Sequence, residues 1–358
     1  MSRPDHCTEE FEQIERQLHV LGWHKARIKF LARFLAAVIS VGTVSLSRIA
    51  SVFPTAAKAE SSYKRIQRFL KDFDLDCAAL ARLVVTIVGA PGPWVLSLDR
   101  TNWKLGRTNI NLLVLGLVHG GVAFPLFWIS LGKAGNSSTA ERIEIMERFL
   151  ACFGRENIAY LCADREFVGR DWLRYLRGKG IGFRLRIKGD THITNRRGAP
   201  VTARGLFWHG RTHEERHLGV RRVWGQPVYV RGMRLPEGDF LIVISEQEAE
   251  LSDYALRWGI ETLFGCLKSR GFDLEATHVT EADRLERLLA LVALAFVWAF
   301  SAGLWRAEQR PIKIKKHGRA AVSVFRLGYD FLRRLLMPLC GITNRADFQK
   351  AVQLLSCT

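Results

Sequence analysis

The chain has 358 residues, of which 48% are hydrophobic and 25% are charged, a balance that excludes a disordered or fibrous protein. Its length predicts one large domain with smaller helical or inserted parts. Lys and Arg total 53 against 35 Asp and Glu, which gives a formal net charge of +18. Such an excess favours a nucleic-acid partner; the alternative is a merely soluble basic surface.

Cysteine usage and the N-terminal residues indicate the compartment. The seven cysteines form no CxxC pair and no close Cys/His cluster along the sequence, and their number is odd, which excludes a disulfide framework and a zinc knuckle. The first residues are polar and lack the apolar core of a signal peptide. We expect a cytoplasmic, nucleoid-associated protein.

Residues 1–90 are expected to form an N-terminal helical DNA-binding module. Apolar residues recur every three to four positions from residue 8 to 88, the period of an amphipathic helix. Ser61 and Ser62 are suited to cap the helix that follows them. That helix carries Arg65 and Arg68, which we take as candidate DNA contacts.

The pattern changes to strands after Pro91, Gly92 and Pro93, a turn-forming sequence. Expected strands occupy residues 94–98, 111–118, 122–131, 158–162 and 182–187, with a tight turn at 119–121 and expected helices at 139–153 and 171–179. This order is that of an α/β protein with an RNase H-like mixed sheet and flanking helices.

The remaining segments complete the expected organisation. Residues 189–246 are glycine-rich and alternate as strands do, which predicts a β-rich insertion. The RNase H-like catalytic domain would comprise residues 91–188 and 247–310, and residues 311–358 a C-terminal helical segment whose last expected helix spans 322–336.

Residues 288–305 form an apolar stretch close to the length of a membrane span. A helix buried between the layers of a globular fold has the same composition. We favour the buried helix and expect no membrane partner, because this stretch stands alone in a chain that is otherwise charged and periodic.

Three carboxylates are candidates for metal-dependent chemistry. Asp99 and Asp164 each follow an apolar strand, where a carboxylate leaves the core, although a capping or turn role explains each one singly. Glu261 lies in an expected helix from Asp253 to Arg270, on one stripe with Tyr254, Arg257 and Lys268. The alternative is a solvated face with ordinary charge pairs. Oxygen ligands of this kind suit Mg²⁺ or Mn²⁺.

The spacing Tyr254-x2-Arg257-x3-Glu261-x6-Lys268 resembles the YREK signature of the IS-four family of DDE transposases, which are encoded by bacterial insertion sequences. The resemblance extends to Asp99-Arg100-Thr101-Asn102-Trp103, to Asp164-Arg165-Glu166-Phe167, to the segment from Ser62 to Phe69 and to the segment from Gly271 to Glu275. It therefore covers most of the chain, with no departure at a catalytic position.

The resemblance implies an RNase H-like catalytic domain with a β-rich insertion between the second and third acids. It implies that Asp99, Asp164 and Glu261 bind two Mg²⁺ (or Mn²⁺) ions and catalyse DNA cleavage. Arg257 and Lys268 would hold phosphates, and Tyr254 would contact the terminal DNA.

The family's cut-and-paste reaction implies double-stranded DNA partners, namely terminal inverted repeats and target DNA, with the ends paired by a homodimer. A hairpin intermediate implies an aromatic residue that holds a displaced base. Trp208 and Trp224 of the insertion are candidates, and packing within the insertion explains them as well. Trp258 is expected to lie in the core.

Two other functions fit parts of the pattern. An RNase H-like nuclease would hydrolyse strands without joining them. An inactive DNA-binding regulator would keep the basic surface but would not require all three acids, so their joint presence favours the transposase.

Overall fold

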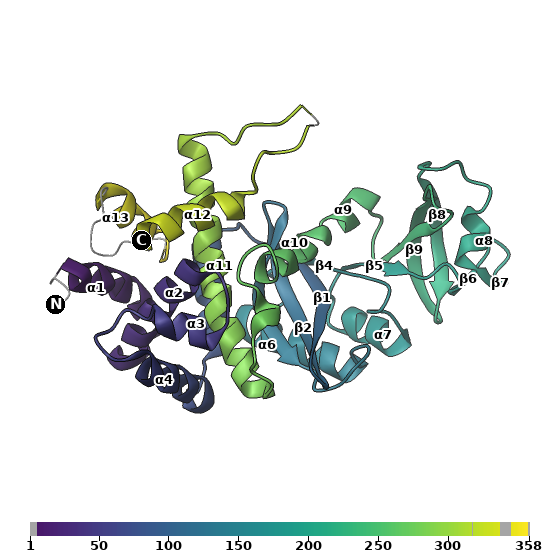
Figure 1. Cartoon of the computed structure of the whole chain (residues 1–358). Helices are drawn as coiled ribbons and strands as arrows, with labels where there is room; N and C mark the ends of the chain where they lie inside the picture. Colours follow the sequence, from purple (N-terminus) through teal and green to yellow (C-terminus); the bar gives the residue numbers. More distant parts are fainter. Residues whose placement is uncertain (1–5, 317, 337–344, 357–358) are drawn as a thin grey trace. The chain divides into compact units, whose positions relative to one another are not determined.

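The computed structural model describes residues 6–316, 318–336 and 345–356 (Figure 1). Cys340, Cys357 and the outermost residues of both expected terminal segments lie outside the described residues. Two compact units are present: a helical unit of Met1–Ala90, Trp103–Ile110 and Leu263–Thr358, and a sheet unit of Pro91–Asn102 and Asn111–Thr262. The four segments expected from the sequence are a different division of the chain, and their boundaries stay a prediction.

The helical unit is built around one long buried helix, α11. This helix packs against α2, α4, α5 and α12. The helices of the unit, apart from the end of α10, are α1 (His6–Leu18), α2 (Lys25–Val41), α3 (Leu46–Ser51), α4 (Ala59–Asp72), α5 (Cys77–Val88), α11 (Ala282–Gln309), α12 (Val324–Leu336) and α13 (Arg345–Gln353), with 3₁₀ turns η1 (His19–Leu21) and η2 (Leu274–Ala276).

The apolar stretch within α11 is a core helix of this unit. The helix is long and apolar enough to cross a membrane, and 89% of its most apolar window is buried inside the protein. Its neighbours explain this burial, since α2 and α5 also present apolar faces to it. The buried-helix interpretation therefore accounts for its composition.

Helices α11 and α12 touch through two glycines. A Cβ atom added to Gly303 would lie 2.0 Å from the carbonyl oxygen of Val324, and one added to Gly328 would lie 1.9 Å from that of Ala299. Both distances are far below van der Waals contact, and the opposing atoms belong to backbone. The two helices can approach this closely only because neither position carries a side chain.

The sheet unit holds the mixed sheet with flanking helices that the sequence predicts. The strand order is β3-β2-β1-β4-β5-β10-β9-β8-β6-β7. β1 (Trp94–Leu105) and β5 (Phe183–Ile187) both pair in parallel with β4 (Ile158–Ala163), whereas β2 (Thr108–His119) and β3 (Val122–Ser130) pair antiparallel. Helices α6 (Thr139–Phe153) and α7 (Arg170–Gly178) provide the connections from β3 to β4 and from β4 to β5.

The predicted β-rich insertion is present between Asp164 and Glu261. It contains β6 (His192–Thr194), β7 (Pro200–Thr202), α8 (Ala203–Phe207), β8 (Arg216–Val223), β9 (Gln226–Arg234) and β10 (Phe240–Ser245). β10 pairs antiparallel with β5, so Ile242 lies opposite Ile187. The inserted strands therefore extend the main sheet instead of forming a separate one.

Two local expectations, on the end of β1 and on the capping of α4, differ from the structure. β1 continues to Leu105, beyond the expected end at Leu98, because its pairing with β2 outlasts its ladder with β4. α4 begins at Ala59 after Lys58, so Ser61 and Ser62 lie inside its first turn and do not cap it.

The expected helix from Asp253 to Arg270 is interrupted. It consists of α9 (Leu251–Ala255) and α10 (Trp258–Leu267). Between them, the amides of Arg257 and Ile260 bond to carbonyls three residues back, the tighter winding of a 3₁₀ turn. The stripe predicted from a constant helical period is therefore broken at Arg257.

Substitution Gly328→Ala should destabilise the helical unit by roughly 1–3 kcal/mol or more, because backbone must move to admit the methyl group. Gly178→Ala in α7 is a matched control, since nothing lies within 4 Å of its Cβ position. The control should be neutral or stabilising by up to about 1 kcal/mol. Denaturant unfolding followed by circular dichroism measures both; equal effects would contradict close packing at Gly328.

Candidate active site

Asp99 and Asp164 lie side by side in sequence register at one end of the parallel ladder. The β1–β4 pairing ends at Leu98 opposite Ala163, and each acid is the next residue along the chain. Carboxyl ends of parallel strands share one edge of a sheet, where functional groups of open α/β sheets gather. On the other side of β4, Arg186 of β5 reaches Asp164 with 4.0 Å between Nη1 and Oδ1.

Asp99 is the most buried of the three predicted acids. Its side chain is 17% exposed, and Oδ1 accepts a hydrogen bond of 2.7 Å from the backbone amide of Arg100. Burial raises the pKa of Asp99 to about 6, and the negative charges of Asp164 and Glu166 act in the same direction. The Arg100 amide and the Arg257 guanidinium oppose this shift. The two neighbouring carboxylates therefore oppose ionisation of Asp99, whereas the Arg100 amide and the Arg257 guanidinium favour it.

Arg257 supplies positive charge to the first and third acids by bridging them. Its Nη1 lies 3.1 Å from Oδ2 of Asp99, and its Nη2 lies 2.5 Å from Oε1 of Glu261. The guanidinium side chain is 6% exposed. Its burial acts to lower the pKa of Arg257, but the nearby Tyr254, Glu261 and Asp99 outweigh burial and raise it. Arg257 is therefore a permanent cation between two carboxylates.

Tyr254 is buried in the structure. It packs with Val243 and Leu251, and its hydroxyl lies 3.5 Å from Oδ1 of Asp164. The resemblance implies that Tyr254 contacts the terminal DNA. The structure gives Tyr254 a contact with the second acid, and its DNA contact stays a prediction.

Two side chains of α10 are solvent-accessible beside Arg257. Glu261 is 40% exposed, so the third acid is the most accessible of the three. Trp258 is 60% exposed, with the Arg257 guanidinium 5.4 Å from its ring centroid. The expectation that Trp258 lies in the core is therefore wrong. The helix reaches this place because Gly259 lies against the β2–β3 hairpin, where a Cβ would be 3.0 Å from the amide nitrogen of Ala123.

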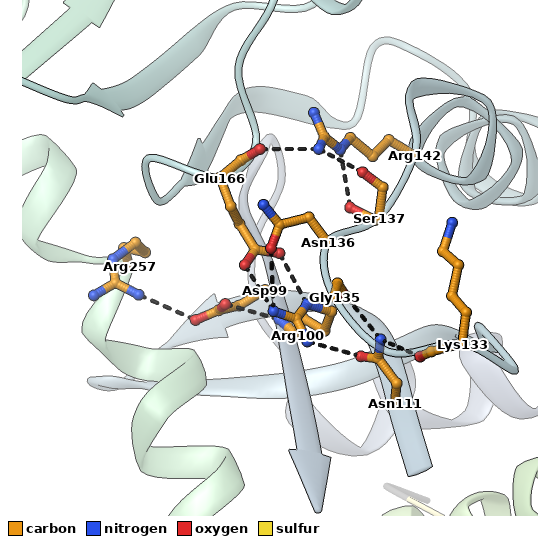
Figure 2. Close-up of polar contacts among 10 residues, drawn as sticks. All are labelled: Asp99, Arg100, Asn111, Lys133, Gly135, Asn136, Ser137, Arg142, Glu166 and Arg257. Carbon is orange, nitrogen blue, oxygen red and sulfur yellow. Dashed lines mark hydrogen bonds and ion pairs between the residues drawn. The ribbon is translucent and has the colours of Figure 1, made fainter. Parts of the chain in front are cut away.

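A second arginine cross-links β1, which carries Asp99, to the loop that follows Asp164 (Figure 2). Arg100 holds Glu166 at two points, Nε to Oε1 at 3.1 Å and Nη2 to Oε2 at 3.0 Å. It also donates to Oδ1 of Asn111 at 3.0 Å. Bidentate pairs of this kind fix orientation as well as charge. The residues that follow the two acids are thus tied to each other.

The loop after Asp164 is anchored from behind by Arg142 of α6. Arg142 is 5% exposed and donates to the carbonyl oxygens of Glu166 at 2.9 Å and Ser137 at 2.7 Å (Figure 2). It also donates to the carbonyl oxygen of Val168 at 3.2 Å. Its guanidinium also lies over the buried ring of Phe167. This loop is therefore a fixed part of the fold.

Three predicted DNA-binding residues belong to the helical unit. Arg65 lies over the ring of Phe30, 5.8 Å from its centroid, and is half-buried, whereas Arg68 is exposed. Lys268 lies just after the end of α10, pairs with Glu275 at 2.8 Å and sits over the Trp103 ring. Of these three cations, Arg68 therefore faces solvent, whereas Arg65 and Lys268 pack against other residues of the helical unit.

The donor chemistry at the site suits hard divalent cations, since Asp99, Asp164 and Glu261 offer only oxygen. Among the residues that the structure describes, no three His, Cys, Asp or Glu side chains gather closely enough to hold a metal ion. Arg257 explains this spacing, because it occupies the position between Asp99 and Glu261. The acids fit a cation in charge and donor type, and at present that cation is Arg257.

Sequence reasoning did not find the positioning roles of Arg100, Asn111 and Arg142. Arg100 and Glu166 are adjacent or nearly adjacent to the predicted acids, which was the available signal for their pairing. Arg142 gave no signal, because its position in α6 shows neither its burial nor the loop that it holds.

Comparison with known proteins shows the family of the chain. Residues 90–298, more than half of the chain, match the family described as Transposase DDE domain. No curated protein sequence gives a significant match. Among solved structures, the chain is similar to the piggyBac transposase in a cryo-EM synaptic complex with hairpin DNA, with a TM-score of 0.47 and 10% identity, over 93% of this chain and 76% of that chain.

The raised pKa of Asp99 predicts that the difference in stability between wild type and Asp99→Asn depends on pH. The folded protein holds the Asp99 proton up to about pH 6, whereas the unfolded value is 3.8, so stability is lost as pH rises between these values. Asp99→Asn removes that loss, and its stability relative to wild type should increase by roughly 2 kcal/mol between pH 4 and pH 7. Denaturant titrations across this range measure the difference, with the exposed Asp171→Asn as control; a constant difference would contradict the prediction.

A double-mutant cycle tests the Arg100–Glu166 link. Arg100→Met and Glu166→Gln should show a coupling energy of roughly 1–3 kcal/mol in denaturant unfolding, because the pair is bidentate and largely buried. The exposed pair Arg174–Asp171, with side chains 66% and 73% exposed, should couple by about 0.5 kcal/mol or less. Equal coupling energies for the two pairs would show that Arg100 does not tie the strand ends together.

Proposed function

Because the chain belongs to the family of transposase DDE domains, we propose that it catalyses cut-and-paste transposition of an insertion sequence, by cleaving DNA at terminal inverted repeats and joining the 3′-hydroxyls to target DNA. The observation that carries this proposal is the convergence of Asp99, Asp164 and the Arg257–Glu261 pair at the end of the β1–β4 ladder, inside the matched region. We assign the chain to the IS-four group of bacterial transposases on its YREK spacing.

The three acids would hold two Mg²⁺ (or Mn²⁺) ions, consistent with the general dependence of DDE domains on divalent metals. When bound, such ions activate an attacking hydroxyl and stabilise the charge of the leaving oxygen. The chain's own residues prepare this site. Arg100 and Arg142 fix the strand ends and the loop after Asp164, and Tyr254 orients the Asp164 carboxylate.

Arg257 has two successive roles in this proposal. Without ions it compensates part of the negative charge of Asp99 and Glu261. If the acids held ions, its guanidinium would be free to grip a phosphate, for which its planar fork is well suited.

A hairpin intermediate requires a surface that holds a displaced base. Trp208 is 55% exposed beside Phe240, and Trp258 is 60% exposed beside Arg257. Trp224 lies in the β8–β9 turn with a positive φ of 48°. Proximity to Arg257 and Glu261 favours Trp258 for base stacking, an assignment that the sequence alone did not suggest.

The proposal further includes paired DNA ends held by a homodimer, in the cytoplasm on nucleoid DNA. The net charge of +18 supports a DNA partner. A labelled duplex that carries the element's terminal repeat, incubated with Mg²⁺ or with EDTA, tests the reaction. Nicked, hairpin and joined products that require Mg²⁺ support the proposal; nicks without joining indicate a nuclease, and binding without products indicates a regulator.

Glu261→Gln should keep DNA binding but abolish cleavage. The loss in cleavage rate should exceed the roughly 10–100-fold that loss of an outer-shell partner costs. Binding survives because Arg257 and the other cations remain. Glu144→Gln is the matched control, because Glu144 is an exposed residue of α6 that forms an ion pair with Arg148 of the same helix. Gel assays of binding and of strand cleavage measure the two effects. Cleavage by Glu261→Gln at the wild-type rate would contradict the role of the third acid.

A further inference from the structure

One face of the helical unit carries a cluster of cations that the catalytic site does not use. We define the basic stripe as the side chains that line one hollow between α4 and α11, namely Lys64, Gln67, Arg68, Lys71 and Arg284. We propose that the basic stripe binds consecutive phosphates of one strand of duplex DNA. This inference rests on the proposed function, because it names the surface by which the enzyme would hold its DNA outside the catalytic site.

The spacing of the stripe aligns its side chains on one side of α4. Lys64, Arg68 and Lys71 stand at offsets of zero, four and seven residues, and all are exposed, so they share one face of the helix. The opposite face is buried through Ile66 and Phe69. The helix therefore cannot rotate to hide its cations without exposing its apolar side.

The stripe is held in place by α11. Arg287 donates from Nη1 to the carbonyl oxygens of Leu70 at 2.9 Å and Lys71 at 3.2 Å, which satisfies carbonyls at the end of α4. Phe69 stacks on Phe30 with 4.1 Å between centroids. A cationic surface fixed before binding loses little conformational freedom when a ligand arrives.

The cations of α4 lack the acidic partners found elsewhere in the unit. Within the part of the chain that the structure describes, Lys64, Arg68 and Lys71 form no ion pair. By contrast, Arg326 of α12 pairs with Asp330 at 2.8 Å, one turn along the same helix. The charge of the stripe is thus available to an anionic ligand, with Arg284, which pairs with Glu281 at 3.3 Å, at its border.

The length of the stripe matches a nucleic-acid backbone. Seven residues of helix span about 10 Å, and each strand of B-DNA carries one phosphate per roughly 3.4 Å of helix axis. Lys64, Arg68 and Lys71 can therefore reach two or three successive phosphates, with Gln67 as a neutral donor between them. A small anion would engage only part of this length, whereas a nucleic-acid backbone uses all of it. The proposed function makes duplex DNA that nucleic acid.

Binding of a fluorescent duplex across a series of salt concentrations tests the inference with the full-length protein. Arg68→Ala combined with Lys71→Ala should weaken binding by about 10-fold or more at 0.1 M salt and lower the slope of log K against log salt by about 2, because two phosphate contacts are lost. Lys25→Ala combined with Lys29→Ala is the charge-matched control on α2, where both lysines are exposed. Arg68→Lys should keep most of the affinity.

The outcomes separate the two proposals. A reduced slope confined to the stripe variant supports the basic stripe, and circular dichroism verifies that its helices remain folded. Equal slopes for wild type, stripe variant and control would overturn the stripe while leaving the transposase proposal intact. If folded wild-type protein does not bind duplex DNA, the proposed function fails together with the stripe.

Discussion

The site depends on a conflict between burial and like charge at the end of the β1–β4 ladder. The parallel pairing brings Asp99 and Asp164 to one edge of the sheet, and burial together with the neighbouring carboxylates raises the pKa of Asp99 to about 6. Such an arrangement is tolerated only where cations compensate it. Arg257, Arg100 and Arg186 are placed around the two acids, each from a different segment of the chain. The fold thus supplies the compensation from distant segments of the chain.

The arginine side chains near the acids make two kinds of contact. Some contacts stay in place, and others would be exchanged when the acids bind ions. Arg100 and Arg142 bind Glu166 and backbone carbonyls, away from the faces of the predicted ligand acids. Arg257 binds Asp99 and Glu261 directly, in the place that the proposed ions would need. The first two are therefore structural under every condition, whereas the contacts of Arg257 depend on what the acids bind. This difference links the fold to the proposed reaction cycle.

Sequence reasoning reached the fold more reliably than the contacts within the candidate site. Periodicity located α6, β4 and α7 within a residue or two because packing against the sheet follows local apolar spacing. The break at Arg257 was missed because a 3₁₀ turn has no signature in residue type. Trp258 was misplaced because an apolar side chain in an apolar helix looks buried until its neighbours are known. Long-range contacts, such as that between Arg142 and Glu166, depend on tertiary placement that spacing does not encode.

The net charge of the chain does not by itself locate a DNA-binding surface. Many of its arginines compensate acids: Arg257 at Asp99, Arg100 at Glu166 and Arg326 at Asp330. These pairs contribute little free field at a distance, because opposite charges a few ångströms apart largely cancel. Cations without acidic partners, such as Arg68 and Lys71 on α4, retain their full field and release counterions when they meet phosphates. Pairing, more than composition, therefore indicates which parts of a strongly basic protein face its polyanionic partner.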